Sequence, residues 1–298
     1  MAKMIGVVVS ERISAGLVVD HKLTGPVRTF PEDREELDGL VELHTDGLVQ
    51  TICEQVVLAA KGAKDIAAVG VALPGLVKEG VVEEAPNLPQ LKGARIQSLL
   101  TAQLHSHGLE AAVCVLNDAD GMAAGLALEH GKLNSVVRVW TLGVGIGYGR
   151  YPFTPGVWEG GHTVVTLDEK ERFCGCGGRG HMEGIMGHRA MRLRFLDMEP
   201  EEVFEAAKKG DRRCVEFKRL WHKALAAGTA SSIHMAGPGK FFLTGFNARF
   251  LDMPILRDYM QQMVKMSPLQ SYSLEIVEDV PETRVLGAAI CAEQAAKQ

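Results

Sequence analysis

The segment CGCGGRGHME, residues 174–183, combines two cysteines, a histidine and a glutamate in one glycine-rich stretch. Single cysteines in folded proteins usually fill apolar space, whereas a Cys-x-Cys pair followed five residues later by His181 is typical of metal ligands. With His162, the thiols of Cys174 and Cys176 would complete a set of two sulfur and two nitrogen donors, which suits tetrahedral zinc. The alternative is that the cysteines are free thiols in a turn and the histidines are surface residues.

The composition limits the class of protein that carries this segment. The chain has 298 residues, a net charge of -5, 46% hydrophobic residues and 23% charged residues, which indicates a folded protein of about two domains. A mildly acidic chain without a run of Lys and Arg is predicted not to bind nucleic acid. No apolar stretch reaches the length of a bilayer span, and the N-terminus lacks the apolar core of a signal peptide. Because the cysteines are scattered as in reducing compartments, we expect a cytoplasmic protein with no membrane partner.

Strand-like and helix-like segments alternate along the chain, which predicts an α/β fold. The runs IGVVV and GLVV predict a hairpin, and apolar residues at helical spacing over 48–58 predict a helix that stops at Gly62. Buried strands are expected at IAAVGVAL and AAVCVLND, and the second ends at Asn117 and Asp118, where a helix begins. Ligands bind at the carboxyl ends of strands in open α/β sheets, so these ends are the first place to expect a site.

The second half of the chain is predicted to be mainly helical. Strand, glycine loop and strand are expected in SVVRVWTLGVGIGYGR, followed by helical sequence over 183–235 with one interruption at GDRR. The segment KFFLTG then predicts a strand, and the chain is expected to end in a helix over 284–298.

Several of these segments resemble the ROK family of sugar kinases and sugar-responsive repressors. Members carry a Glu-x-Gly-His segment followed by a C-x-C-G-x-x-G-C-x-E motif, and this chain has EGGHTVV followed by CGCGGRGHME. The resemblance spans most of the chain, in the family's order, through GVALPGLV, APNLPQLKG, VLNDADGMAAG, TLGVGIGYG and EEVFEAAKKGDRRC. It implies a two-domain actin-like ATPase fold, also called RNase H-like, that closes over a sugar in the cleft between the domains.

The resemblance also implies domain limits and a metal site. The smaller α/β domain would contain residues 1–118 and the C-terminal helix 284–298, and the larger one residues 119–283 with the zinc loop. The family binds structural zinc through one His and three Cys, which corresponds to His162, Cys174 and Cys176, with His181 in place of the third cysteine. Imidazole is an ordinary zinc ligand, so the exchange keeps a complete set of four donors. Family members are commonly homodimers or other homo-oligomers.

Six residues correspond to the family's sugar pocket, and Asp118 corresponds to the base that takes a proton from the attacking hydroxyl. The set implied to bind the hexose is Asn87, Asn117, Asp118, Glu159, His162 and Glu183. Taken singly, each has a structural alternative, such as a turn former, a helix cap or a solvated loop charge. Taken in the family's order, they predict an intact sugar site.

The nucleotide motifs differ from those of the family. Its D-x-G-G-T hairpin is replaced by GVVVSERISAG, with Val8 in place of the Asp and Glu11 bringing negative charge to the turn. The second phosphate loop keeps Gly143 and Gly145 without its threonine, and the adenosine segment FFLTGFNARF keeps only Gly245. These three changes argue against ordinary ATP and magnesium binding.

Two classes of function follow. The first is a glucokinase-like hexose kinase that transfers a phosphoryl group from ATP with Asp118 as base. The second is a catalytically silent pseudokinase that binds or senses a sugar. A repressor of this family would need an N-terminal helix-turn-helix, and here the first strand is expected to start at about Met4, so we expect no DNA-binding module.

Overall fold

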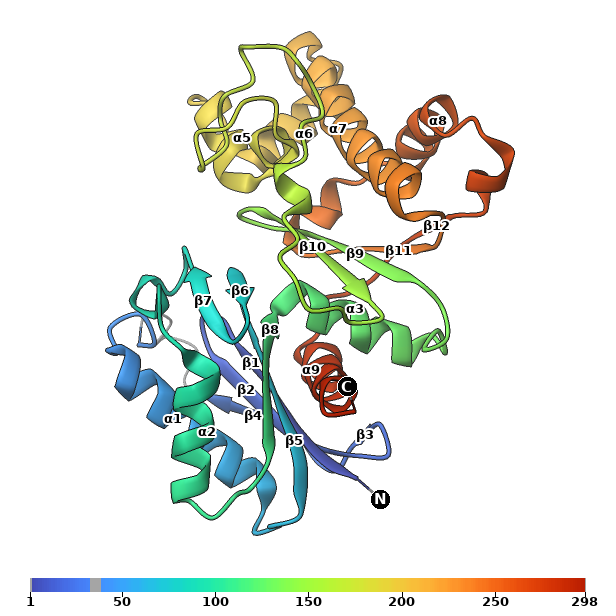
Figure 1. Ribbon diagram of the computed structural model, residues 1–298. Coiled ribbons are helices and arrows are strands. Elements are labelled where there is room, and N and C mark those ends of the chain that lie inside the picture. The colour runs from blue at the N-terminus through green and yellow to red at the C-terminus, as the bar shows by residue number, and fades with distance from the viewer. Residues whose placement is uncertain (1, 33–38, 298) are drawn as a thin grey trace. The chain divides into compact units, whose positions relative to one another are not determined.

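The computed structural model describes residues 2–32 and 39–297, and its chain divides into two compact units (Figure 1). The first unit contains Met1–Val137, Gly149–Val157 and Val280–Gln298, and the second contains Arg138–Tyr148 and Trp158–Asp279. The division expected from the sequence ended the first part of the smaller domain at residue 118, whereas the structure assigns the helix that starts there to the first unit. The reason is its direct packing on the C-terminal helix, described below.

The first unit is built on one sheet, in which the strand order is β3-β2-β1-β5-β8 and β4 pairs with β2. The strands are β1 (Lys3–Val9), β2 (Ile13–Val19), β3 (Lys22–Leu23), β4 (Arg28–Phe30), β5 (Ile66–Leu73) and β8 (Ala112–Asn117). Strands β1 and β2 form the predicted antiparallel hairpin, while β1, β5 and β8 are parallel. Parallel strands end at the same edge of a sheet, so the ends of β5 and β8 lie together.

Helices cover both faces of this sheet (Figure 1). They are α1 (Thr45–Ala60), α2 (Ile96–Ser106), α3 (Asp118–Glu129) and α9 (Pro281–Ala295), with a short ribbon of β6 (Leu76–Lys78) and β7 (Val81–Glu84) and a turn of 3-10 helix, η1 (Pro89–Leu91). Alternate residues of β1 face opposite ways, as the pleat requires: Ile5 and Val7 join the core under α1 and α2, whereas Met4 packs with Ala289 of α9.

Helices α3 and α9 pack with their backbones in near contact. A Cβ atom added at Gly287 of α9 would lie 1.7 Å from the carbonyl oxygen of Gly121, and one added at Gly125 of α3 would lie 1.9 Å from that of Thr283. Only glycine fits at both positions. At the far end of α3, the Thr283 hydroxyl donates to Glu129 Oε1 at 2.7 Å. The two helices therefore form one rigid layer.

The second unit contains the sheet β10-β9-β11-β12, with β11 and β12 parallel. Its strands are β9 (Val137–Leu142), β10 (Ile146–Tyr151, ending in the first unit), β11 (Lys240–Thr244) and β12 (Ser273–Ile276). Its helices are α4 (Met182–Met186), α5 (His188–Arg194), α6 (Pro200–Lys208), α7 (Arg212–Ala236) and α8 (Met253–Met263), with 3-10 turns η2 (Gly160–His162), η3 (Phe246–Phe250) and η4 (Ser267–Gln270). An aromatic core that includes Trp140, Phe204 and Trp221 holds these elements together.

Most predicted elements are confirmed, with differences at their ends. The helix predicted over 48–58 runs from Thr45 to Ala60, where Lys61 and Gly62 adopt positive φ and end it. The predicted helical half was wrong in one respect, because it is interrupted three times rather than once: at Gly187, over 195–199 and at the expected GDRR segment. Among the described residues, no helix is both long and apolar enough to cross a membrane.

Candidate functional site

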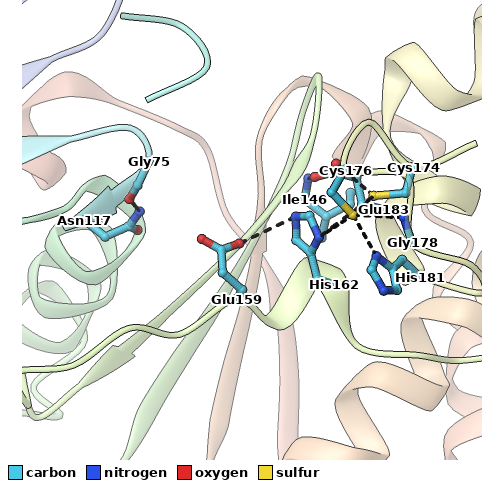
Figure 2. A network of polar contacts seen from close by, with 10 residues as sticks. All are labelled: Gly75, Asn117, Ile146, Glu159, His162, Cys174, Cys176, Gly178, His181 and Glu183. Carbon is cyan, nitrogen blue, oxygen red and sulfur yellow. Dashed lines mark hydrogen bonds and ion pairs between the residues drawn. The ribbon is translucent and has the colours of Figure 1, made fainter. Parts of the chain in front are cut away.

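The four predicted metal ligands lie together in the second unit (Figure 2). One donor atom from each of His162, Cys174, Cys176 and His181 lies within 4.8 Å of all the others. The sulfur of Cys176 lies 3.2 Å from His162 Nδ1, 3.3 Å from His181 Nδ1 and 3.4 Å from the sulfur of Cys174. The distance between Cys174 Sγ and His162 Nδ1 is 3.9 Å.

This donor set has the dimensions of a tetrahedral zinc site. With Zn–S and Zn–N bonds of about 2.3 and 2.1 Å, tetrahedral donors are separated by roughly 3.4–3.8 Å, close to the separations seen between these atoms. Burial, the largest cause, raises the pKa of the Cys174 thiol to about 12, and burial followed by the nearby His162 lowers the pKa of His181. The lowered pKa of His181 favours the neutral imidazole that a metal needs, while Cys174 would be ionised by the metal itself.

The cluster also positions two of the predicted sugar-binding residues. His162 turns Nδ1 toward the cysteines, and its Nε2 lies 3.7 Å from a carboxylate oxygen of Glu159. A carboxylate on the second ring nitrogen is the usual partner of a metal-bound histidine. Glu183, in the first turn of α4, accepts a hydrogen bond from the Ile146 amide at 3.0 Å and lies 3.6 Å from the Cys174 sulfur (Figure 2). The structure thus brings Glu159, His162 and Glu183 together.

The remaining predicted sugar residues belong to the first unit. Asn117 caps α3, because its side-chain oxygen accepts from the Ala119 amide at 2.8 Å. Its side-chain nitrogen donates to the Gly75 carbonyl, also at 2.8 Å (Figure 2). These bonds tie the end of β8 to the turn after β5. Asp118 is the first residue of α3, and Asn87 is an exposed turn residue between β7 and η1.

Asp118 has a partner that the sequence patterns did not predict. Its Oδ2 accepts from a guanidinium nitrogen of Arg284, at the start of α9, at 3.0 Å. The side chains are 24% and 16% exposed, respectively. No local motif could have identified Arg284, because it is brought to Asp118 only by the packing of α9 on α3.

A second acid lies two residues further along α3. The side chain of Asp120 is buried, and its Oδ1 accepts from the Arg150 amide at 2.9 Å. Burial is the main cause that raises the pKa of Asp120 to about 7, opposed in part by Arg150. The two acids of α3 are thus in contrasting surroundings, one buried and the other paired with a guanidinium group.

The glycines predicted to approach a nucleotide lie in closely packed loops of the second unit. The Gly143 carbonyl accepts from the His188 amide and from the Asn247 side chain, each at 3.0 Å. A Cβ atom at Gly145 would lie 2.5 Å from Glu183 Oε2, and Gly245 has φ 92° with Leu142 O only 2.6 Å from such an atom. Phe246, 48% exposed, packs its ring beside Gly143. Gly145 and Gly245 thus occupy positions where a side chain would overlap neighbouring atoms of the protein.

The first hairpin has no acid in the position of the family's Asp. Val8 is 4% exposed in β1, and the turn is closed by the Ser10 amide, which donates to the Arg12 carbonyl at 3.0 Å. The Arg12 guanidinium is engaged by the carbonyl oxygens of Pro31 and Glu32. These contacts close the turn between β1 and β2 and fix Arg12 against the segment that follows β4.

A second group of metal-type side chains, His188, Glu199 and Glu201, also has donor atoms within 4.8 Å of one another. Here the carboxylates already have cationic partners, Arg192 for Glu199 and Arg249 for Glu201. Both also lie at the N-terminus of α6, where Glu199 forms a capping box. Since the helix N-terminus favours anions, these acids are explained without a metal.

Comparison with solved structures places the architecture in a known class. The ROK hexokinase from Thermus thermophilus is similar over 99% of both chains, with a TM-score of 0.78 and 22% identity. A ROK family glucokinase from Streptomyces griseus, in complex with glucose and AMPPNP, is similar over 98% of this chain and 100% of that one, with a TM-score of 0.67 and 23% identity. The predicted two-domain actin-like ATPase fold is therefore confirmed.

The sequence comparisons define the family. The chain belongs to the ROK family, which matches residues 33–295. Glucokinase from Pyrobaculum calidifontis is 29% identical over 212 residues, covering 66% of this chain and 68% of that protein. The protein is thus a homologue of ROK glucokinases.

Proposed function

We propose that the protein is a hexose kinase in which Asp118 accepts the proton of the attacking sugar hydroxyl. The sugar oxygen would bond to the γ-phosphorus of ATP, the bond from this phosphorus to the bridging oxygen would break, and ADP would leave. The observation that carries the proposal is the position of Asp118 in the first turn of α3, fixed by the Asn117 cap. A helix N-terminus favours the ionised carboxylate that a base requires.

We assign sugar recognition to the six predicted side chains. Recognition of sugar hydroxyls requires hydrogen-bonding groups that the protein holds in place. Unpaired buried polar groups reject a sugar that lacks the matching hydroxyl. Asn117 is held by Gly75, His162 by the Cys/His cluster and Glu183 by the Ile146 amide, so three of the six are already oriented. The similar ROK family glucokinase from Streptomyces griseus, which was solved in complex with glucose and AMPPNP, supports a hexose as the substrate class.

A coupled phosphorylation assay on a panel of hexoses tests the kinase. Wild-type protein is expected to consume ATP only with its sugar, and Asp118→Asn is expected to lower kcat by on the order of 100-fold or more, the usual contribution of a positioned base. Asp20→Asn is the matched control, since Asp20 is an exposed acid of the same unit in a left-handed conformation that Asn tolerates. Equal activity of wild type and Asp118→Asn would overturn the role of Asp118.

The second candidate is a sugar-binding protein without turnover, and the donor loops favour it. Val8 is buried where a kinase of this family has its acid, and Phe246 packs beside Gly143. Calorimetric titration with hexoses and, separately, with magnesium-ATP distinguishes the two. Binding of a hexose without binding of ATP identifies a sugar receptor, whereas binding of both with sugar-dependent turnover identifies a kinase.

We propose further that His162, Cys174, Cys176 and His181 hold one structural zinc ion. Zinc would close the glycine-rich loop, which has little core of its own, and would hold His162 in place for the sugar. Metal analysis of the purified protein is expected to give about one zinc per chain, lost in the Cys174→Ser/Cys176→Ser variant. A metal-free wild type that binds its sugar unchanged would contradict this. The homodimer expected from the family is open to sedimentation analysis.

A further inference from the structure

The ion pair between Asp118 and Arg284 links residues that are 166 positions apart in the sequence. Both side chains are mostly buried, and the contact of Asp118 Oδ2 with the guanidinium has the length of a good hydrogen bond, 3.0 Å. Arg284 occupies the first turn of α9, which runs against the start of α3. A guanidinium holds a carboxylate in a defined orientation as well as balancing its charge.

The backbones of α3 and α9 pack closely beneath this pair. Glycines at 125 and 287 let α3 and α9 approach, because a Cβ atom at either position would overlap a backbone carbonyl of the other helix. Such close packing leaves little freedom for one helix to slide along the other. The close packing of α9 on α3 therefore fixes the backbone of Arg284 relative to that of Asp118, and the crossing of the two helices sets the distance that the guanidinium must span.

The charged groups around Asp118 come from three elements. Arg284 faces it from α9, Asp120 lies on its own helix, and Arg150 lies beside Asp120 from the end of β10. Asp118 is one cause of the raised pKa of Asp120, although burial is the largest. Arg284 donates to Asp118 itself, and it favours negative charge on that acid rather than on its buried neighbour.

We infer that Arg284 is the positioning residue of the catalytic base: it holds Asp118 as an oriented carboxylate for the sugar hydroxyl. The inference rests on the proposed function, because it needs Asp118 to act as the base. It adds a specific role for a residue outside every motif that defined the sugar and nucleotide sites. Loss of the guanidinium would leave Asp118 at the helix N-terminus but less well oriented, and more easily protonated.

The competing interpretation is that the pair only stabilises the packing of α9. A stabilising pair and a positioning pair differ in what its removal changes. Removal of a purely stabilising pair lowers the free energy of unfolding and leaves the pH profile of turnover unchanged. Removal of a positioning pair lowers kcat while KM changes little, and displaces the acid limb of the kcat/KM profile.

The experiment compares wild type with Arg284→Gln, Arg284→Lys and Thr283→Val in the coupled assay across pH. Thr283→Val is the matched control, because it removes the neighbouring α9 contact with Glu129 without touching Asp118. For Arg284→Gln we expect kcat to fall by on the order of tenfold or more and the acid limb to move to higher pH, with partial rescue in Arg284→Lys. Thr283→Val is expected to keep both the wild-type kcat and the wild-type profile.

Three outcomes are decisive. If Arg284→Gln keeps the wild-type kcat and profile while wild type is active, the positioning role is overturned and the proposed kinase stands. If Thr283→Val lowers kcat and displaces the pH profile as Arg284→Gln does, the change comes from helix packing. The positioning role of Arg284 is then overturned as well. If wild type transfers phosphoryl to no hexose, the proposed function itself falls, and the positioning role falls with it.

Discussion

Asp120 provides a test of the first unit that does not depend on any ligand. Its carboxyl is buried and hydrogen-bonded to the Arg150 amide, and burial raises its pKa to about 7 from the ordinary 3.8. The folded state therefore keeps a proton that the unfolded chain loses. The stability that this proton contributes is fully present below the unfolded pKa and is lost as the pH rises through the folded pKa.

The magnitude follows from the size of the shift. A shift of roughly 3 pKa units, at 1.36 kcal/mol per unit, corresponds to about 4 kcal/mol of unfolding free energy lost between about pH 4 and pH 8. Asp120→Asn removes the titration, and the amide oxygen still accepts from the Arg150 amide. We therefore expect the unfolding free energy of the variant, relative to wild type, to rise by about 3 kcal/mol between about pH 5 and about pH 8.5, the part of the loss that falls in this range.

Urea unfolding of both proteins at several pH values measures the difference directly. The difference in unfolding free energy between variant and wild type cancels the titrations that both proteins share. The main one is that of His222, because burial lowers its pKa to about 4, so that its contribution to stability is lost as the pH falls. Asp20→Asn, on the surface of the same unit, is expected to change stability equally at all pH values. Parallel profiles for wild type and Asp120→Asn would refute the reasoning.

Three further predictions concern packing, the donor loop and the metal. Gly287→Ala places a methyl group 1.7 Å from an α3 carbonyl oxygen and should cost several kcal/mol of unfolding free energy, about 3 or more. Gly47→Ala, in α1, adds a Cβ atom that only touches the Leu43 side chain at 3.9 Å, and it should instead stabilise by up to about 1 kcal/mol. Equal effects of the two substitutions in thermal melts would contradict the packing argument. Phe246→Ala should open the loop beside it and strengthen the binding of magnesium-ATP by on the order of tenfold, or about 1.4 kcal/mol, as measured by calorimetry. Unchanged affinity would show that the Phe246 ring does not obstruct the nucleotide. His181→Cys gives the ligand set that the family resemblance implies and should slow zinc loss to a chelator, whereas an unchanged rate of loss would argue against His181 as a ligand.

The metal cluster and the start of α3 were accessible from the sequence because their determinants are local. Cys174, Cys176 and His181 lie within eight residues of one another, so the short loop alone brings their side chains together. Asn117 and Asp118 follow directly from a buried strand, and an Asn before a helix is a cap in almost any context. The family motifs predicted the fold for the same reason, because each is a short segment that contains its own turn or strand end.

What tertiary structure alone decided is the environment of these residues. The sequence shows Asp118 and Asp120 as two acids on one helix, but burial and a guanidinium from α9 make their surroundings opposite. Likewise, His162 is a ligand candidate in the sequence, whereas the cysteines that its Nδ1 faces come from a loop 12 and 14 residues further along the chain. Desolvation and long-range ion pairs depend on which atoms surround a group, and the chain supplies those atoms from distant segments. The sequence by itself therefore determined which side chains are available for chemistry, and packing determined their charge and orientation.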